Sequence, residues 1–361
     1  METERPLIDT SVVREVGARR EAARRTGSAS GLLAALRWLR EPDGPLARIP
    51  DAQSPAAEAR FIASLAAVDM SLAFSHWAHQ MVLTYVAEAD DAMFRRVWGE
   101  RLRALEVVGS TALAAAMTSH VTGAPLPIEA VERAGELELT GQIAWASNLF
   151  RPQFLLVTAT ELPGKGRAIV ALRGSDPRIQ IAPFPDLLDL QDTASSSIRL
   201  EAARVRLDDI IAVDFERFVR RVRPRFLLWQ ASFCWGLAAQ SLFEAASRVR
   251  GGINEVFAPD QQDLTTELDR IERAIVEALA ADAALRAGQS PLAARPIREV
   301  VKVRLDAARL AGEATRLEAK VVGGRGYVVH SATARRQREA AFLPIQSPTE
   351  GQLRWELSRS T

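Results

Sequence analysis

A segment at residues 139–148 carries an aromatic ring and a hydroxyl at a spacing that could hold a flat ligand. We interpret residues 140–141 as a turn and the residues after them as a strand. Because side chains alternate along a strand, Ile143, Trp145 and Ser147 would share one face. A flat conjugated ring could lie against the Trp145 indole while Ser147 hydrogen-bonds the polar edge of that ring. The alternative is a core tryptophan and a hydroxyl at a strand end, since aromatic residues are enriched in strands.

Other residue types that can do chemistry have less support from their surroundings. His76 and His79 lie three residues apart in an apolar helical segment, so both could face one side. No cluster of Cys, Asp or Glu accompanies them as metal ligands, and we interpret them as core or pocket-lining residues. The serines at 195–197 lack a nearby His–acid pattern that would make a nucleophile, so we interpret them as loop or strand-edge hydroxyls.

The elements that must position these residues follow the order helix, strand, helix. Apolar residues recur at three- and four-residue spacing over residues 12–104, and residues 58–87 are apolar nearly all round, as in a buried helix pair. Proline and glycine at residues 42–45 separate two early helices. We therefore expect an N-terminal helical domain at residues 1–108.

Short apolar or alternating runs with turns between them occupy the middle of the chain. They lie at residues 136–140, 154–159, 168–172, 179–181 and 197–205. This pattern predicts a small β-barrel or sandwich domain at residues 109–213. Helical spacing then returns at residues 214–249, 261–287, 293–321 and 331–342. It predicts a C-terminal four-helix bundle at residues 214–361, and a mostly helical α+β fold overall.

Composition excludes several classes of protein. The 361 residues include 46 basic and 45 acidic side chains, for a net charge of +1, so no footprint for nucleic acid is visible. The single cysteine, Cys234, excludes a disulfide framework and favours a reducing compartment. The charged N-terminus has no apolar signal core, and no uncharged apolar stretch reaches about 18 residues. We therefore expect a cytoplasmic protein without a membrane span.

Taken together, four motifs resemble the acyl-CoA dehydrogenase family over about residues 58–356. They are GQIAWASN at 141–148, TASSS at 193–197 with LDDII at 207–211, DFERF at 214–218 with Pro224, and VGGRGY at 322–327 with Arg335, Arg338 and Glu339. Their order and spacing match the helical domain, β-domain and four-helix bundle of that family.

The resemblance implies bound FAD. Trp145 would pack on the isoalloxazine, and Ser147 would hydrogen-bond near the reactive ring nitrogen in place of the family's usual threonine. Gly323 and Gly324 would let the backbone approach the adenosine pyrophosphate, although glycines also end helices commonly. Arg250 followed by two glycines, with Gln261 or Gln262, is a loose match to the segment that grips the pyrophosphate. The sequence departs from the family at residues 109–120, which lack its usual acid and Gly-Ser-Asp.

In the family's reaction a carboxylate removes the proton α to a thioester carbonyl while a hydride moves to the flavin. Ser347 occupies the place of the usual C-terminal glutamate. A minority of the family carries the base at the start of the first bundle helix, where Glu216 matches, and Glu350 is the second candidate. The alternative for Glu216 is a solvated or salt-bridged residue favoured by the helix dipole.

Three functions remain open. The first is an FAD-dependent dehydrogenase of acyl thioesters, carried by CoA or a carrier protein, with an electron-transferring flavoprotein as acceptor. The second is a flavin monooxygenase or oxidase on the same fold, which uses oxygen and needs no carboxylate base. The third is a non-catalytic relative. By resemblance, we expect a homodimer or homotetramer whose cofactor sites include residues of a neighbouring subunit.

Overall fold

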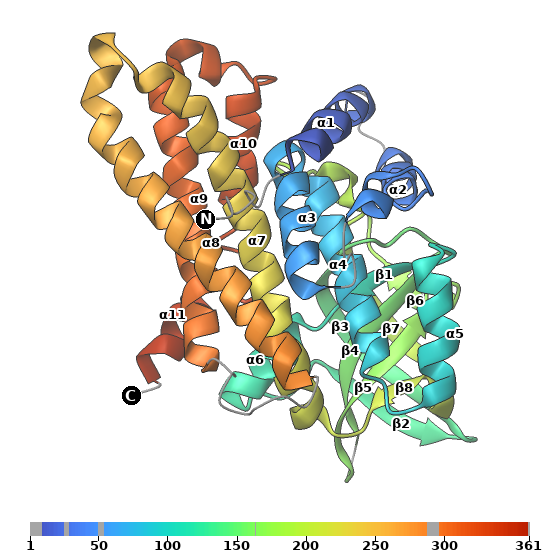
Figure 1. The fold of residues 1–361 in the computed structure, drawn as a ribbon. Helices are drawn as coiled ribbons and strands as arrows, with labels where there is room; N and C mark the ends of the chain where they lie inside the picture. The colour runs from blue at the N-terminus through green and yellow to red at the C-terminus, as the bar shows by residue number, and fades with distance from the viewer. Residues whose placement is uncertain (1–8, 25–28, 50–53, 163, 287–295, 360–361) are drawn as a thin grey trace.

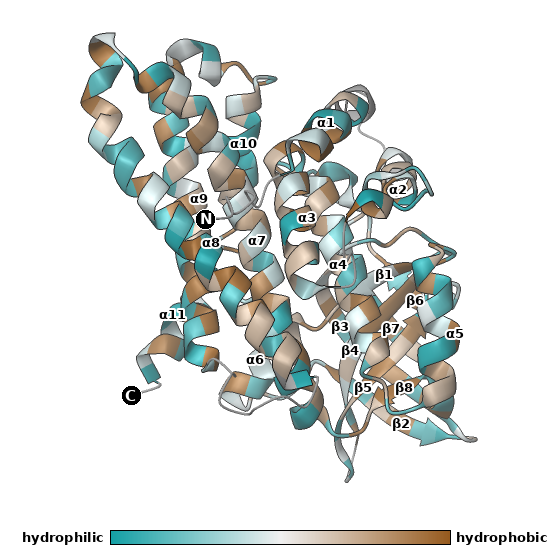
Figure 2. Ribbon diagram, viewed as in Figure 1, coloured by the Kyte–Doolittle hydropathy of each residue, from teal (hydrophilic) through white to brown (hydrophobic). Residues whose placement is uncertain are grey.

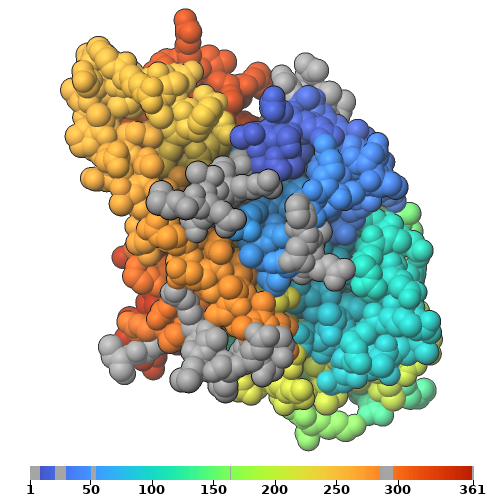
Figure 3. All heavy atoms as spheres, in the orientation of Figure 1, coloured from blue at the N-terminus to red at the C-terminus, as the bar shows by residue number. Residues whose placement is uncertain are grey.

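The chain folds into N-terminal helices, a middle sheet and a C-terminal helical region, as Figure 1 shows. This computed structural model describes residues 9–24, 29–49, 54–162, 164–286 and 296–359. In Figure 3 the N-terminal segments, coloured blue, lie beside the yellow-to-red helical region on one face, with the cyan and green middle segments below. No helix in the described ranges is long and apolar enough to cross a membrane.

The N-terminal part is helical because its apolar residues recur on helical faces. Its elements are α1 Thr10–Arg24, α2 Ala29–Trp38, η1 Pro45–Arg48, α3 Pro55–Val68, α4 Met70–Ala87 and α5 Ala92–Arg103. Helix α3 ends and α4 begins at Asp69. The Asp69 carboxylate accepts a hydrogen bond from Leu72 N (2.8 Å) and caps α4. Both helices are buried on nearly all sides, as their composition predicts.

Within the described residues, eight strands form one mixed sheet in the order β6-β7-β3-β2-β4-β5-β8, with β1 paired to β4. The middle elements are β1 Val108–Thr111, α6 Ala114–Thr122, β2 Ile128–Arg133, β3 Glu136–Ala146, β4 Phe154–Leu162, β5 Gly166–Arg173, β6 Ile179–Ile181, η2 Gln191–Thr193, β7 Ser196–Arg206, η3 Leu207–Asp209 and β8 Ile210–Ala212. Strands β5 and β7 are not neighbours in this order but contact each other, so the sheet curls over its own core. In the hydropathy view of Figure 2, brown hydrophobic stretches run along strands beside the β1 and β7 labels.

Two features of β3 differ from the sequence prediction. Residues 140–141 lie inside the strand rather than in a turn, because β3 continues its pairing with β2 through Gly141. The register between β3 and β7 then shifts between Ile143 and Ala146. A bulge of this kind adds a residue and breaks the alternation of faces. Ile143 is therefore buried at 6% exposure whereas Trp145 is 57% exposed, and the prediction that they share a face is wrong.

The C-terminal helices match the predicted ranges closely. They are α7 Phe215–Val249, η4 Gly252–Phe257, α8 Ala258–Arg286, α9 Ile297–Val322, η6 Gly323–Tyr327, α10 Ala332–Phe342 and α11 Glu350–Arg359. Predicted residues 287 and 293–295 lie outside the described residues. α7 packs along both α9 and α3, so one helix joins the bundle to the N-terminal helices and their shared apolar core. Asp214 caps α7 by accepting from Arg217 N (3.0 Å).

Candidate functional site

Four hydroxyl-bearing residues from three separate strand regions meet at the end of β3, and we call them the hydroxyl cluster. Ser147 Oγ lies 2.6 Å from Ser195 Oγ, which also lies 2.6 Å from Thr193 Oγ1. Ser110 Oγ donates to the Ser147 carbonyl at 2.6 Å. The cluster therefore joins β1, the end of β3 and the segment that leads into β7. Ser195 was interpreted from the sequence as a strand-edge hydroxyl, and its partnership with Ser147 depends on this tertiary arrangement.

Asn148 anchors the cluster to the helices behind it. Its side-chain amide donates to the carbonyls of Ser75 (2.8 Å) and Gly109 (3.0 Å) and is completely buried. Its φ of 63° is a left-handed conformation that asparagine tolerates better than most residues. The Gly109 amide in turn donates to His79 Nδ1 at 2.9 Å. These contacts fix the backbone on both sides of the hydroxyl cluster.

The two histidines of α4 are core residues, as the sequence interpretation expected. His79 is 1% exposed, and burial, followed by the nearby Arg40 charge, holds its pKa well below the usual range. His76 is fully buried with Nε2 2.6 Å from Glu58 Oε1. Within the described ranges, no group of three or more His, Cys, Asp or Glu side chains is placed to hold a metal ion.

Trp145 offers an open aromatic face next to the hydroxyl cluster. The bulge in β3 turns Ala146 into the core and leaves Trp145 outside it, while Ser147 is half-buried immediately after the strand. An exposed indole beside a hydroxyl pair suits a flat ligand with a polar edge. The pairing of Trp145 with Ser147 stays a prediction, and Ile143 does not belong to it.

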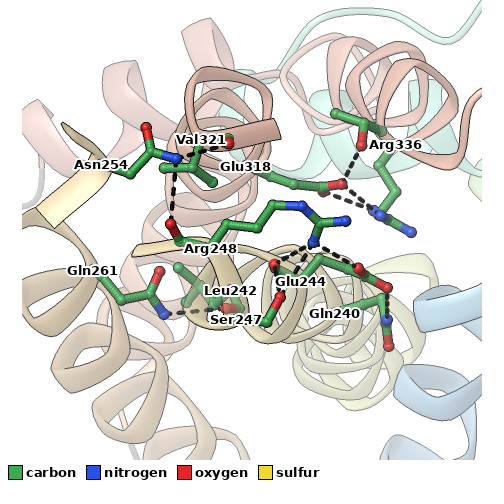
Figure 4. Close-up of polar contacts among 11 residues, drawn as sticks. Gln240, Leu242, Glu244, Ser247, Arg248, Asn254, Gln261, Glu318, Val321 and Arg336 are labelled. Carbon is green, nitrogen blue, oxygen red and sulfur yellow. Dashed lines mark hydrogen bonds and ion pairs between the residues drawn. The ribbon is translucent and has the colours of Figure 1, made fainter. Parts of the chain in front are cut away.

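The two glycine-rich segments lie together at one end of the helical region. Asn254 of η4 donates to the carbonyls of Arg248 (3.2 Å) and Val321 (3.1 Å), which ties η4 to the end of α9, as Figure 4 shows. Gly323 follows at once with a φ of 67°, and a Cβ added at Gly323 or Gly324 would meet no atom within 4 Å. The backbone at this end of the molecule is open to close approach by a ligand.

Arg250 and Gln261 lie at the same end. Arg250 is exposed, and the two glycines that follow it have φ values of 77° and 68°, again with open space around them. Gln261 donates from Nε2 to the Leu242 carbonyl at 3.1 Å (Figure 4), but its buried Oε1 has no hydrogen-bond partner. The Arg250 guanidinium and the open glycine backbone fit a phosphate group. The unpartnered Gln261 oxygen is an acceptor, so it fits a hydroxyl or amino group rather than a phosphate.

Glu216 is held by residues distant in sequence rather than by its arginine neighbours. His120 Nδ1 of α6 lies 2.6 Å from its Oε2, and Arg167 of β5 pairs with its Oε1. Arg167 also donates to Ser119 Oγ at 2.7 Å. The Glu216 side chain is 38% exposed. Among the described residues, no hydrogen bond joins this triad to the hydroxyl cluster.

Glu350 and Ser347 sit near each other on the chain but have different partners. Glu350 Oε1 accepts from Arg309 at 3.0 Å from Nη2. The Ser347 carbonyl accepts from Gln230 Nε2 of α7 at 3.0 Å. Ser347 is therefore fixed by its backbone.

A buried guanidinium that sequence reasoning missed supports this loop. Arg304 of α9 is 1% exposed and donates to Gln230 Oε1 (3.1 Å), the Leu343 carbonyl (3.1 Å) and Gln346 Oε1 (3.0 Å). Its other partner is the buried Cys234 thiol, whose pKa is raised by burial. An arginine on the apolar face of an amphipathic helix was the signal that could have revealed it.

Comparison with known proteins defines the fold. No protein-family model matches the sequence, and no curated protein is significantly similar to it. The solved structures give clear matches. The glutaryl-coenzyme A dehydrogenase–glutaryl-CoA complex is 14% identical, with a TM-score of 0.80 over 99% of this chain and 95% of that chain.

Two further matches differ in the reactions that their names state. Butyryl-CoA dehydrogenase from Megasphaera elsdenii is 12% identical with a TM-score of 0.79, over 96% of this chain and 95% of that chain. A nitroalkane oxidase variant crystallised with 1-nitrooctane is 15% identical with a TM-score of 0.80, over 97% and 94%. The chain therefore has the acyl-CoA dehydrogenase fold, as its four sequence motifs predicted.

Proposed function

We propose that this protein is an FAD-dependent oxidoreductase whose flavin ring lies on Trp145. The observation that carries the proposal is the open indole of Trp145 beside the Ser147–Ser195 hydroxyl pair, on a chain with the acyl-CoA dehydrogenase fold. Bound FAD would supply an electron-accepting ring, while the protein orients it and places donors at its edge. Ser147 would donate to that edge, and Ser195 would then donate to Ser147 instead of Thr193.

The cofactor's pyrophosphate would lie at the glycine-rich end of the helical region. Gly323 and Gly324 leave room for it, and Arg250 and Gln261 would supply a cation and an amide. By resemblance to the family, these groups would bind the cofactor of a neighbouring subunit. Large exposed apolar side chains surround this end, which supports a homodimer or homotetramer with contacts here. They are Phe243, Ile253, Val256, Tyr327, Val328 and Val329.

For the reaction, we propose α,β-dehydrogenation of an acyl thioester carried by CoA or a carrier protein. Glu216 would remove the α-proton, and His120, 2.6 Å away, would share the proton that Glu216 gains. Arg167 would hold the Glu216 carboxylate in position through their ion pair. The electrons would pass to an electron-transferring flavoprotein. Glu350 is the second candidate base.

A flavin oxidase or monooxygenase that uses oxygen is the second candidate function. Both candidate bases already form ion pairs, Glu216 with Arg167 and Glu350 with Arg309, which favours this alternative. Serine at position 347 favours it as well. The reaction of reduced flavin with oxygen requires no carboxylate base. Nitroalkane oxidase shows by its name that the same fold supports an oxidase.

A visible absorption spectrum of the purified protein, followed by anaerobic titration with a panel of acyl-CoAs, tests these proposals. Flavin absorption that bleaches with an acyl-CoA supports the dehydrogenase. Flavin that does not bleach, but reacts rapidly with oxygen once chemically reduced, supports the oxygen-using alternative. A protein that neither retains nor rebinds FAD would contradict both and leave the non-catalytic relative. Sedimentation as an FAD-bound monomer would contradict the proposed oligomer.

A further inference from the structure

A cavity of about 330 Å³ lies between the start of α4, the segment 186–192 and α10. Its lining residue Leu190 accepts a hydrogen bond from Thr193 of the hydroxyl cluster through its carbonyl. Five carboxylates line it, from Asp69, Asp186, Asp189, Asp192 and Glu339. Three leucines of the 186–192 segment supply apolar wall. A cavity of this size lies at the small end of the range for ligand sites.

The arginines around the cavity form ion pairs with its carboxylates. Arg20 of α1 pairs with Asp69 at 2.8 Å and with Asp192 at 2.5 Å. Arg335 pairs with Glu339 at 2.6 Å, and Arg338 pairs with Asp189 at 3.2 Å. Arg20 therefore pairs with two of the five carboxylates, and Arg335 and Arg338 pair with one each.

Glu339 provides the specific feature that points to a ligand. The residue is 2% exposed, and its Oε1 accepts from Arg335 Nη1 and from Met70 N at 3.2 Å. Its buried Oε2 has no hydrogen-bond partner, although a buried carboxylate oxygen without a donor is costly. Burial raises the pKa of Glu339 to about 6, despite the opposing effect of Arg335, and burial also raises the pKa of Asp189.

We propose that this cavity binds a small organic ammonium ion, with Glu339 Oε2 and Asp189 as its hydrogen-bond acceptors and the leucines against its alkyl chain. An ammonium group brings up to three donors and one positive charge, which match the unpartnered Glu339 oxygen and the acidic lining of the cavity. A metal ion fits less well, because no metal-ligand group of three His, Cys, Asp or Glu occurs among the described residues. The proposal does not depend on the flavin or on the reaction.

Calorimetric titration with n-butylamine at constant ionic strength and pH 7.5 tests the proposal. n-Butanol is the neutral probe of similar size. We expect saturable binding of one butylammonium per chain, and binding of n-butanol at least tenfold weaker. Equal binding of both probes would overturn the proposal, as would displacement of butylamine by an equal concentration of magnesium ions, since that would indicate simple charge screening.

Two variants remove the proposed acceptors while keeping side-chain size. Glu339→Gln and Asp189→Asn should each weaken butylamine binding at least fivefold, because hydrogen bonds to charged groups are the stronger ones. Asp306→Asn is the matched control, since Asp306 also pairs with an arginine, Arg270, but lies on α9 outside the cavity. An equal loss in Asp306→Asn would contradict the assignment of the site.

The unmodified protein gives a test that needs no substitution. Butylamine stays protonated between pH 5 and pH 7.5, because alkylammonium pKa values lie near about 10. Its affinity should rise at least threefold over this interval as Glu339 ionises, given the raised pKa of that carboxyl. Constant affinity over the same interval would overturn the role of Glu339, even if the Glu339→Gln protein could not be folded.

Discussion

Ser147 and Ser195 are 48 residues apart in sequence, yet their Oγ atoms lie 2.6 Å from each other. Thr193 Oγ1 continues the chain of hydroxyls and donates to the Leu190 carbonyl at 2.8 Å. With Thr193 donating to a carbonyl, Ser195 donates its single proton to Thr193 and accepts from Ser147. Ser147 can donate to a ligand only when it gives up its bond to Ser195, or when Ser195 turns its proton from Thr193 to Ser147.

Replacing the Ser147 hydroxyl tests its role toward FAD. Ser147→Ala should raise the dissociation constant for FAD about five- to tenfold, the effect of one lost hydrogen bond. Ser195→Ala should have a smaller effect, because it acts only through Ser147. Ser197→Ala is the nearby control that leaves the hydroxyl cluster intact. Fluorescence titration of apoprotein with FAD gives the constants, and an unchanged constant for Ser147→Ala would contradict the proposed contact.

Glu216 is the residue that separates the two candidate reactions. Glu216→Gln keeps the side chain's size but removes its basicity, so dehydrogenation should fall by about 10²- to 10⁴-fold. Anaerobic flavin reduction by the best acyl-CoA in a stopped-flow instrument measures the effect directly. Glu350→Gln serves as comparison and should change the rate little. If Glu216→Gln leaves the turnover of every accepted acyl-CoA unchanged, the proposed base is wrong.

The close contact of α3 and α7 predicts a large stability effect. A Cβ on Gly236 would lie 2.1 Å from the Ala63 carbonyl oxygen, so Gly236→Ala must push two backbones apart. We expect it to lower the free energy of unfolding by about 3 kcal/mol. Gly312→Ala is the contrasting variant, because the nearest atom to its Cβ is a flexible arginine nitrogen at 3.5 Å. It should raise stability by up to about 1 kcal/mol, since alanine favours helix. Urea denaturation of both variants measures these two changes in the free energy of unfolding.

The raised pKa of Glu339 predicts a dependence of stability on pH. Its pKa rises from 4.5 to about 6 on folding. As pH increases, the unfolded chain therefore loses this proton before the folded chain does. The contribution of Glu339 to the free energy of unfolding falls between about pH 4.5 and pH 6. The expected loss is about 2 kcal/mol. The difference between wild type and Glu339→Gln in urea denaturation, measured at pH 4.5 and pH 7, isolates this contribution. A difference that does not change with pH would contradict it.

The sequence predicted the elements better than it predicted their contacts. The helices at 215–249 and 332–342 were placed within one residue, because helical periodicity is a local property. The bulge near Trp145 arises from pairing with β7, so the alternation of β3 alone suggested the wrong face. The hydroxyl cluster was also invisible, since β1, β3 and β7 meet only in the folded sheet.

The site residues show the same limit. Glu216 has several arginines nearby in sequence, but its partners Arg167 and His120 are 49 and 96 residues away. The cavity carboxylate Asp192 pairs with Arg20, 172 residues away. Charge pairs of this kind depend on how separate elements pack. Residue spacing along the sequence therefore cannot predict them. The family resemblance predicted the fold correctly and proposed Trp145 with Ser147, but it did not indicate the residues that contact Ser147.

The backbone contact between Gly236 and Ala63 also limits how the molecule can open. Two helices packed this closely cannot slide past each other without a collision, so α3 and α7 must move as one rigid body. Any motion that admits a substrate must therefore leave the α3–α7 pair intact and displace other elements around it. Gly236 thus makes this helix pair the fixed reference against which the rest of the protein can move.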